Sequence, residues 1–245
     1  MKISRYRKEN DITYALGATV VMEYLLNRPD LVSAVILHPA FRSEETIDKI
    51  NDICSQKGIP LTTEEKPFNI LSQKENCFVI GVVKKEEQIL DKGDHVVLVN
   101  PSNAGNMGTI MRSCAGFEIR ELAVIRPCVD PFDPKTVRAS MGALANIKVR
   151  MYDSFEDYRK EFPENNIYPF MLDGSSKLQE TEIKAPFSLV FGNEATGLPA
   201  DFQRIGNPIR IEHGHAIDSL NLPIAASIAL FSATAERFGG KGKIF

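Results

Sequence analysis

The chain has 245 residues, of which 43% are hydrophobic and 25% charged, and its formal net charge is -3. These values are typical of a globular protein with one large domain or two modest ones. No apolar run approaches the roughly 18 to 20 residues that span a bilayer, and the N-terminus lacks the apolar core of a signal peptide, so we expect a cytoplasmic protein. The four cysteines form no Cys-x-x-Cys pair, which argues against a zinc site and a disulfide framework.

The N-terminal segment alternates predicted helices and strands. Asp11 is expected to cap a helix that runs through Leu26, because apolar residues recur along this stretch. Strands are predicted at 34–37 and 77–83, with a helix at 45–56 that Gly58 ends. The polar interval 84–94 then marks a boundary between domains 1–90 and 91–245.

The second domain restarts the pattern with short apolar runs and helices between them. The predicted strands are 95–99, 122–125, 147–149, 168–172, 189–191 and 209–211, with a helix at 108–115 and a last long helix that opens at 219–223. Repeated strands and helices with short links predict an α/β fold with a mostly parallel sheet covered on both faces.

A glycine-rich turn, Asn100 to Arg112, follows the first strand of the second domain. Its glycines would let backbone N–H groups approach a ligand at a helix N-terminus. Asn103 stands where a dinucleotide-binding Gly-x-Gly-x-x-Gly motif needs its first glycine, which weakens a nucleotide-dependent oxidoreductase. Arg112 would lie near the ligand end of the sheet, although an arginine on a helix more often pairs at the surface.

The apolar run 187–191 predicts a buried strand that ends at Gly192, and ligands bind beyond such carboxyl ends in parallel sheets. The loop 192–198 has the two glycines of a phosphate-binding loop, but Leu198-Pro199 replaces the required Lys-Ser/Thr, so an NTPase is not expected. Glu194 could either cap a nearby helix or meet a ligand.

The last motif region contains Glu212-His213-Gly214-His215, a weak metal signal because no matching ligands occur elsewhere, and we expect no metal. Asp218 or Ser219 could cap the final helix, with Pro223 in its first turn.

Basic residues gather locally despite the acidic total. Residues 111–150 hold an excess of basic over acidic side chains, namely Arg112, Arg120, Arg126, Lys135, Arg138, Lys148 and Arg150 against Glu118, Glu121, Asp130 and Asp133. The N-terminal arm adds Arg5, Arg7 and Lys8 around Tyr6. Such patches can neutralise RNA phosphates, although a charged run is more often a solvated face.

Three motifs in order, at 106–112, 191–198 and 211–221, resemble the signature motifs of the SpoU (TrmH-like) ribose methyltransferases of the SPOUT superfamily. Residues 138–144 are similar to the family's segment between the first two motifs, and residues 1–90 to a small α/β substrate-binding domain that many members carry. The resemblance implies a deep trefoil knot in the C-terminal domain, S-adenosylmethionine as cofactor, and a homodimer whose final helices pack together.

The resemblance also assigns residues. The cofactor would be held by the backbone around Leu172, Gly192, Ile211 and Leu220, and the ribose would be faced by Asn106, Arg112, Glu194, Ser219 and Asn221. Arg5, Arg7, Lys8 and Arg138 are the expected RNA contacts. Two positions depart from the family pattern: Glu212-His213 replaces a Pro-Met pair, and Pro223 replaces a small residue.

We therefore predict an S-adenosylmethionine-dependent RNA 2'-O-ribose methyltransferase. Ribosomal RNA is favoured over tRNA because an added N-terminal domain can grip a folded hairpin by shape. A tRNA enzyme, or an RNA-binding ribosome-assembly factor without turnover, is the alternative. Arg112 is either a base with a strongly lowered pKa or, as we favour, a clamp on the adjacent phosphate.

Overall fold

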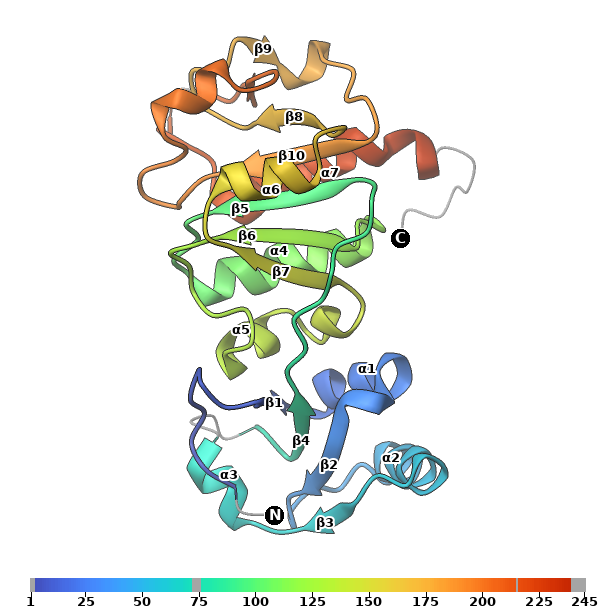
Figure 1. The fold of residues 1–245 in the computed structure, drawn as a ribbon. Coiled ribbons are helices and arrows are strands. Elements are labelled where there is room, and N and C mark those ends of the chain that lie inside the picture. The colour runs from blue at the N-terminus through green and yellow to red at the C-terminus, as the bar shows by residue number, and fades with distance from the viewer. Residues whose placement is uncertain (1–2, 72–75, 215, 239–245) are drawn as a thin grey trace. The chain divides into compact units, whose positions relative to one another are not determined.

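The computed structural model describes residues 3–71, 76–214 and 216–238, and the chain divides into two compact units (Figure 1). Unit 1 comprises Met1–Glu86 and Asp130–Asn146, and unit 2 comprises Glu87–Val129 and Ile147–Phe245. The chain therefore passes between the units at 86/87, 129/130 and 146/147. The boundary expected near residue 90 lies close to the first junction, but segment 130–146, expected in the second domain, packs within unit 1.

Unit 1 is built on a four-stranded mixed sheet with strand order β1-β4-β2-β3. β1 and β2 run antiparallel to β4, and β3 runs parallel to β2. The strands are β1 (Ile12–Leu16), β2 (Val32–Leu37), β3 (Leu61–Thr63) and β4 (Val79–Lys84), and the helices are α1 (Ala18–Asn27), α2 (Glu44–Lys57), α3 (Lys66–Leu71) and α5 (Pro134–Ala139). As predicted, α2 ends at Gly58, which has the left-handed conformation.

The expectation of one helix from Asp11 to Leu26 was wrong at its start. Residues 12–16 form β1, which pairs along its whole length with β4, from Ile12 opposite Lys84 to Leu16 opposite Ile80. Gly17, with φ of 106°, then turns the chain into α1. Strand pairing and burial in the sheet outweigh the helical spacing of the apolar residues here.

Hydrogen bonds explain why segment 130–146 belongs to unit 1. The Tyr6 hydroxyl donates to the Asp130 carboxylate at 2.5 Å, and the Thr13 hydroxyl donates to the Phe132 carbonyl at 2.5 Å. α5 also packs against β1. At Gly142, an added Cβ would lie 2.5 Å from the Glu23 side chain, so the turn there has no room for a larger residue.

Unit 2 contains a five-stranded parallel sheet with strand order β7-β6-β5-β10-β8, which confirms the predicted parallel α/β fold. Its strands are β5 (His95–Val99), β6 (Glu121–Ile125), β7 (Lys148–Tyr152), β8 (Asn166–Pro169) and β10 (Phe187–Phe191). A second, two-stranded sheet pairs β9 (Ser176–Lys177) with β11 (Ile209–Arg210). Within the described ranges, no helix is both long and apolar enough to cross a membrane.

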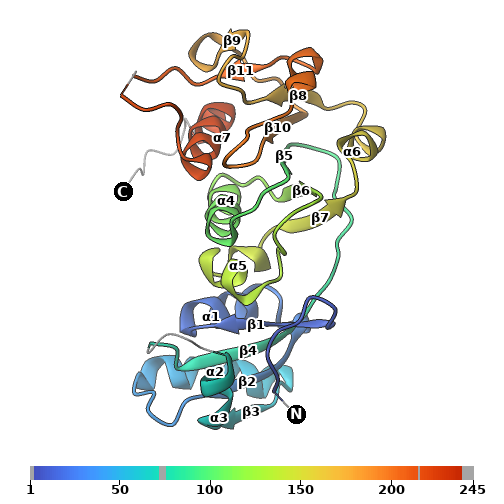
Figure 2. The same ribbon diagram turned by 90° about the vertical axis from the view of Figure 1, so that its left-hand side faces the viewer.

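Helices cover both faces of this sheet. α4 (Ala104–Gly116) and α7 (Leu222–Phe238) pack together on one face, and α6 (Phe155–Glu161) covers the other, as Figures 1 and 2 show. α7 begins at Leu222, so Asn221 stands at its N-cap, and neither Asp218 nor Ser219 holds the capping position we expected. Because α4 begins four residues earlier than the predicted 108, residues 104–112 of the glycine-rich stretch are helical, and only 100–103 precede the helix.

A buried polar chain lies beside α6. The Tyr158 hydroxyl is 2.9 Å from Nδ1 of His95 and 2.5 Å from Oγ of Ser188, and Nε2 of His95 is 2.8 Å from the Asp91 carbonyl oxygen. The His95 side chain has no exposed surface. Burial lowers the pKa of His95 below its ordinary value, so the neutral ring fits this chain, with one nitrogen donating and the other accepting.

Candidate functional site

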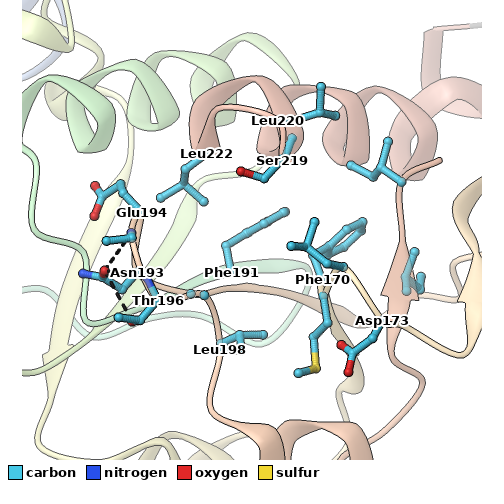
Figure 3. Close-up of a pocket in the computed structure, with 18 of the residues that line it drawn as sticks. Phe170, Asp173, Phe191, Asn193, Glu194, Thr196, Leu198, Ser219, Leu220 and Leu222 are labelled. Carbon is cyan, nitrogen blue, oxygen red and sulfur yellow. Dashed lines mark hydrogen bonds between the residues drawn. The ribbon is translucent and has the colours of Figure 1, made fainter. Parts of the chain in front are cut away.

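A pocket of about 310 Å³ lies beyond the carboxyl ends of β8 and β10, where ligands bind in parallel α/β sheets (Figure 3). Four segments meet there: the loop after β8, the loop after β10, the stretch after β11, and the start of α7. The lining residues are 170–173, 191–198, Ile209, Ile211, His213, Ser219, Leu220, Leu222 and Ala225. The walls are largely apolar, and the Phe170 and Phe191 rings stack at a centroid distance of 4.7 Å.

The loop after β10 is narrow because its backbone folds back on itself. Asn193 and Gly197 exchange two backbone hydrogen bonds, of 3.1 and 2.9 Å. The Asn193 side-chain oxygen accepts the N–H groups of Ala195 and Thr196, drawn as dashed lines in Figure 3. A Cβ added to Gly192 would lie 2.1 Å from the Gly197 carbonyl carbon, so only glycine fits this position.

Glu194 sits at the tip of this loop and binds the start of α4. One carboxylate oxygen accepts the Ser102 N–H at 3.0 Å and the Ser102 hydroxyl at 2.7 Å. The other accepts the Asn103 N–H at 3.1 Å and the Asn106 amide at 3.3 Å. In Figure 3 the carboxylate points away from the Phe170 and Phe191 rings. Of the two roles the sequence left open for Glu194, the contact with a helix start is the one observed.

The protonation of Glu194 follows from these contacts. Burial alone would raise its pKa, but the hydrogen bonds from the Ser102 N–H and hydroxyl and from Asn106 outweigh burial, and the pKa of Glu194 lies below its usual value. The side chain is therefore a carboxylate at neutral pH. It joins the loop after β10 to α4 and orients the Asn106 amide.

Asn106 lies in the first turn of α4. Its N–H donates to the side-chain oxygen of Asn103, the N-cap residue, at 3.0 Å, and its amide NH₂ donates to Glu194. Within the described residues nothing donates to the amide oxygen of Asn106, which can therefore accept a further hydrogen bond. Asn103, which stands where a dinucleotide-binding motif needs its first glycine, is therefore the N-cap of α4.

The structure brings together most of the predicted site. The four expected cofactor positions, Leu172, Gly192, Ile211 and Leu220, all line the pocket, as do Glu194 and Ser219. Asn106 is connected to it through Glu194, and Asn221 directly precedes α7. Arg112 is exposed on α4, does not line the pocket, and makes no ion pair or hydrogen bond within the described residues.

The departures from the family pattern have distinct surroundings. The Glu212 carboxylate is 3.2 Å from the Lys177 ammonium and 3.5 Å from the Arg210 guanidinium, and the pair with Lys177 lowers the pKa of Glu212. His213 lines the pocket, and its Nδ1 is 3.0 Å from the Ile211 carbonyl oxygen. His215 lies outside the described residues. Among those described, no group of three His, Cys, Asp or Glu side chains is arranged to hold a metal.

Sequence reasoning missed Phe170 and Asp173 as pocket residues. The Asp173 carboxylate makes no hydrogen bond or ion pair within the part of the chain that the structure describes. The Gln203 amide donates to the backbone carbonyl oxygen of Asp173, not to its side chain. The available signal was its place just after the strand predicted at 168–172, where polar groups meet ligands.

The expected RNA contacts fall in unit 1. Arg5 and Arg138 line one cavity there, although they are far apart in the sequence. Arg7 and Lys8 are exposed on the N-terminal arm and do not line it.

Comparison with known proteins links this site to a family. Residues 94–231 match the model of the SpoU rRNA Methylase family. A crystal structure of AdoMet-bound rRNA methyltransferase from Sinorhizobium meliloti is similar, with a TM-score of 0.79 and 25% identity, and the match covers 94% of this chain and 89% of that one.

Two curated relatives match a shorter stretch. A putative tRNA (cytidine(34)-2'-O)-methyltransferase from Listeria innocua is 30% identical over 153 residues, which are 60% of this chain and 90% of the relative. Ribosomal RNA small subunit methyltransferase G 2 from Syntrophobacter fumaroxidans is 33% identical over 136 residues, which are 56% of this chain. That stretch spans only 26% of the second relative's length.

Proposed function

Because the chain belongs to the SpoU rRNA Methylase family, we propose that it transfers the methyl group of S-adenosylmethionine to a ribose 2'-hydroxyl of ribosomal RNA. The observation that carries this proposal is the pocket after β8 and β10, where Leu172, Gly192, Ile211 and Leu220 meet beside Glu194. The AdoMet-bound S. meliloti structure, which matches nearly the whole chain, supports the cofactor.

The choice of ribosomal RNA rests on how much of the chain each relative covers. The S. meliloti rRNA methyltransferase matches 94% of this chain, whereas the L. innocua tRNA relative matches 60%. Unit 1 would serve as the substrate-binding domain, since an added domain lets an enzyme grip folded RNA by shape. We also propose that the protein works in the cytoplasm, where its substrate would be found.

The pocket fits the proposed cofactor in shape and chemistry. Apolar side chains such as Phe191, Leu198 and Leu222 can cover an adenine, and the tight loop at Gly192 offers backbone groups that any larger side chain would block. The Asp173 carboxylate, which has no partner among the described residues, would serve the positively charged or hydroxyl-bearing parts of the ligand.

Methyl transfer is an in-line displacement, so alignment and exclusion of water are the main demands on the protein. When bound, S-adenosylmethionine supplies the electrophilic methyl group. Glu194 fixes the Asn106 amide, whose oxygen would accept the hydrogen bond of the ribose hydroxyl, and Ser219 of the pocket lining and Asn221 would align the sugar. Because the Glu194 carboxylate already accepts several hydrogen bonds and its pKa is lowered, we propose that the proton leaves to water.

Arg112 is proposed to bind the phosphate next to the target ribose. A guanidinium resists deprotonation and pairs with phosphate through two parallel hydrogen bonds. Its side chain is exposed and makes no polar contact among the described residues, so it is available to an incoming anion.

We propose a trefoil knot in unit 2, with the chain after β10 threaded past β8. Two close approaches support it. A Cβ at Gly206 would lie 2.1 Å from the Ile167 carbonyl oxygen, and one at Gly174 would lie 2.4 Å from the Ile209 carbonyl carbon. The returning segment therefore passes β8 at backbone contact before it reaches α7.

We propose a homodimer through α7. Ile224, Ile228 and Phe231 are 52%, 37% and 59% exposed, and their spacing of four and three residues places them on one face of the helix. An apolar stripe of this kind on a surface helix is typical of a face that another protein covers.

The decisive experiment incubates the protein with labelled S-adenosylmethionine and unmodified total RNA from its own organism. RNA classes are then separated and searched for alkali-resistant dinucleotides. Label in one rRNA fragment that resists alkali would establish ribose methylation. Label in tRNA would overturn the choice of substrate, and cofactor binding without transfer to any RNA would overturn the enzymatic activity.

A further inference from the structure

Unit 1 contains a cavity of about 780 Å³, which we call the arm cavity. Four parts of the chain line it: the N-terminal arm with Arg5, the end of β1 with Leu16, the end of α3 with Asn69 to Leu71, and the α5 segment from Asp133 to Met141. All of these belong to unit 1, so the cavity is complete within one compact body. A cavity of this size can hold a small organic group together with its hydration.

The rim of the arm cavity is cationic and unpaired. Arg5, Lys135 and Arg138 line it, and none of the three side chains makes an ion pair or hydrogen bond within the described ranges. Asp133 also lines the cavity, so the lining carries three cations and one carboxylate. The Asp133 carboxylate accepts the Lys135 backbone N–H at 2.8 Å, and the Asp130 carboxylate accepts the Tyr6 hydroxyl at 2.5 Å. The rim therefore favours an anion.

Most of the remaining lining is apolar, although Tyr6 and Asn69 also contribute to it. Leu16 contributes from β1, Ile70 and Leu71 contribute from α3, and Met141 contributes from the turn after α5. Met141 is 42% exposed and has a φ of 52°, a conformation that is costly for a residue with a side chain. The turn is held because Gly142, packed against Glu23, follows it. A polarisable thioether on a fixed turn suits contact with a flat ring.

A nucleotide combines both kinds of chemistry, an anionic phosphate and a flat base. We propose that the arm cavity binds a single unstacked nucleotide of the RNA substrate, with its phosphate at Arg5, Lys135 and Arg138 and its base against the apolar lining. This inference rests on the proposed function, since it takes RNA as the substrate. RNA-binding proteins read splayed-out bases of loops and bulges in this way, whereas a stacked duplex cannot enter such a cavity.

The proposal gives segment 130–146 a role in binding. Arg138 and Lys135 lie in the sequence that matches the methylase family, yet they line a cavity of unit 1. The occupied cavity would fix which nucleotide of a hairpin is held and therefore the register of the RNA relative to this unit.

The test measures binding of full-length protein to 16S and 23S rRNA transcripts at several salt concentrations. Arg138→Ala is expected to weaken affinity by about three- to tenfold at moderate salt and to reduce the salt slope by about one. Ala139→Phe fills the cavity without removing charge and should weaken binding with an unchanged slope. Lys57→Ala is the matched control, since Lys57 is an exposed cation of unit 1 that does not line the cavity.

Folding and function are monitored separately. Each variant should keep the wild-type rise in melting temperature on adding S-adenosylmethionine, because the lining of that pocket lies in unit 2. In the methylation assay, KM for RNA should rise while kcat is retained. If Arg138→Ala and Ala139→Phe both bind RNA like Lys57→Ala while the wild type methylates RNA, the arm cavity proposal fails and the enzymatic proposal stands. Weakened RNA binding in a protein that methylates no RNA would support the cavity and reject the enzyme.

A direct probe avoids dependence on the identity of the substrate. Methyl-labelled methionine in full-length protein gives an NMR signal for Met141, assigned with Met141→Leu. Adding uridine or adenosine monophosphate should shift this signal, and inorganic phosphate should shift it much less. Equal shifts with phosphate alone would overturn the base-binding half of the proposal.

Discussion

Replacing Glu194 with glutamine tests the contact between the loop after β10 and α4. One carboxylate oxygen accepts two donors of Ser102, and the other accepts donors of Asn103 and Asn106. Glutamine has a single acceptor oxygen, so its NH₂ must face donors on one side. Hydrogen bonds to a charged group contribute about 1.5–3 kcal/mol each when buried. Glu194 is only half-buried, so we expect a total loss of about 2 kcal/mol.

That loss corresponds to a fall in melting temperature of about 4–8 °C for a domain of this size. The transition to follow is the one that S-adenosylmethionine raises, because it reports on unit 2. Glu164→Gln is the matched control, since Glu164 is exposed and makes no ion pair or hydrogen bond among the residues described. The Glu194→Gln variant should also methylate RNA more slowly, because the Asn106 amide loses its fixed orientation.

The pH dependence gives a second check. The pKa of Glu194 is lowered in the folded protein, so its contribution is present above the unfolded pKa of about 4.3 and is lost as the pH falls through the lower folded value. The difference in melting temperature between wild type and Glu194→Gln should therefore shrink below about pH 4.3. A variant as stable as Glu164→Gln at neutral pH would refute this account of the loop.

Four further predictions concern separate parts of the molecule. Arg112→Lys should keep substantial methylation with weaker RNA affinity, and unchanged affinity with activity lost at every pH would reject the phosphate clamp. Gly192→Ala should abolish the rise in melting temperature caused by S-adenosylmethionine, because its Cβ would lie 2.1 Å from the Gly197 carbonyl carbon. The control Gly116→Ala should keep this rise, because its Cβ would meet nothing within 4 Å. The pKa of His95 is lowered by burial, so the stability of the wild type should fall as the pH drops below about 6.5. His95→Gln should lose less stability over this pH range, and an equal decline in both proteins would contradict the prediction. Phe231→Asp should sediment as a monomer and Ser232→Asp as a dimer, and an unchanged dimer in both would exclude the α7 face.

The features that sequence predicted well are those decided by neighbouring residues. The run 187–191 with Gly192 after it predicted a buried strand with a ligand loop, and the structure has β10 and the pocket there. Gly58 was expected to end a helix and does so. In each case the spacing of the apolar residues and one glycine, all close together in the sequence, determine the local structure.

Features that depend on distant partners could not be predicted. Residues 12–16 have helical spacing, and only pairing with β4 makes them a strand. Segment 130–146 has no sequence signal for joining unit 1, because its partners Tyr6 and Thr13 are more than a hundred residues away. For the same reason, the sequence could name Arg5 and Arg138 separately but could not show that they line one cavity.

The interrupted order of unit 1 has a consequence for synthesis of the protein. N-terminal domains commonly fold while the rest of the chain is still being made. Here α5 and the turn at Gly142 belong to the first unit, so its packing stays incomplete until residue 146 has emerged. By then β5 and β6 are already outside the ribosome, while their neighbours β7 and β10 have not yet emerged. From residue 146 onward unit 1 has all of its segments, whereas β5 and β6 stay exposed to wrong partners until the rest of unit 2, up to α7, has emerged.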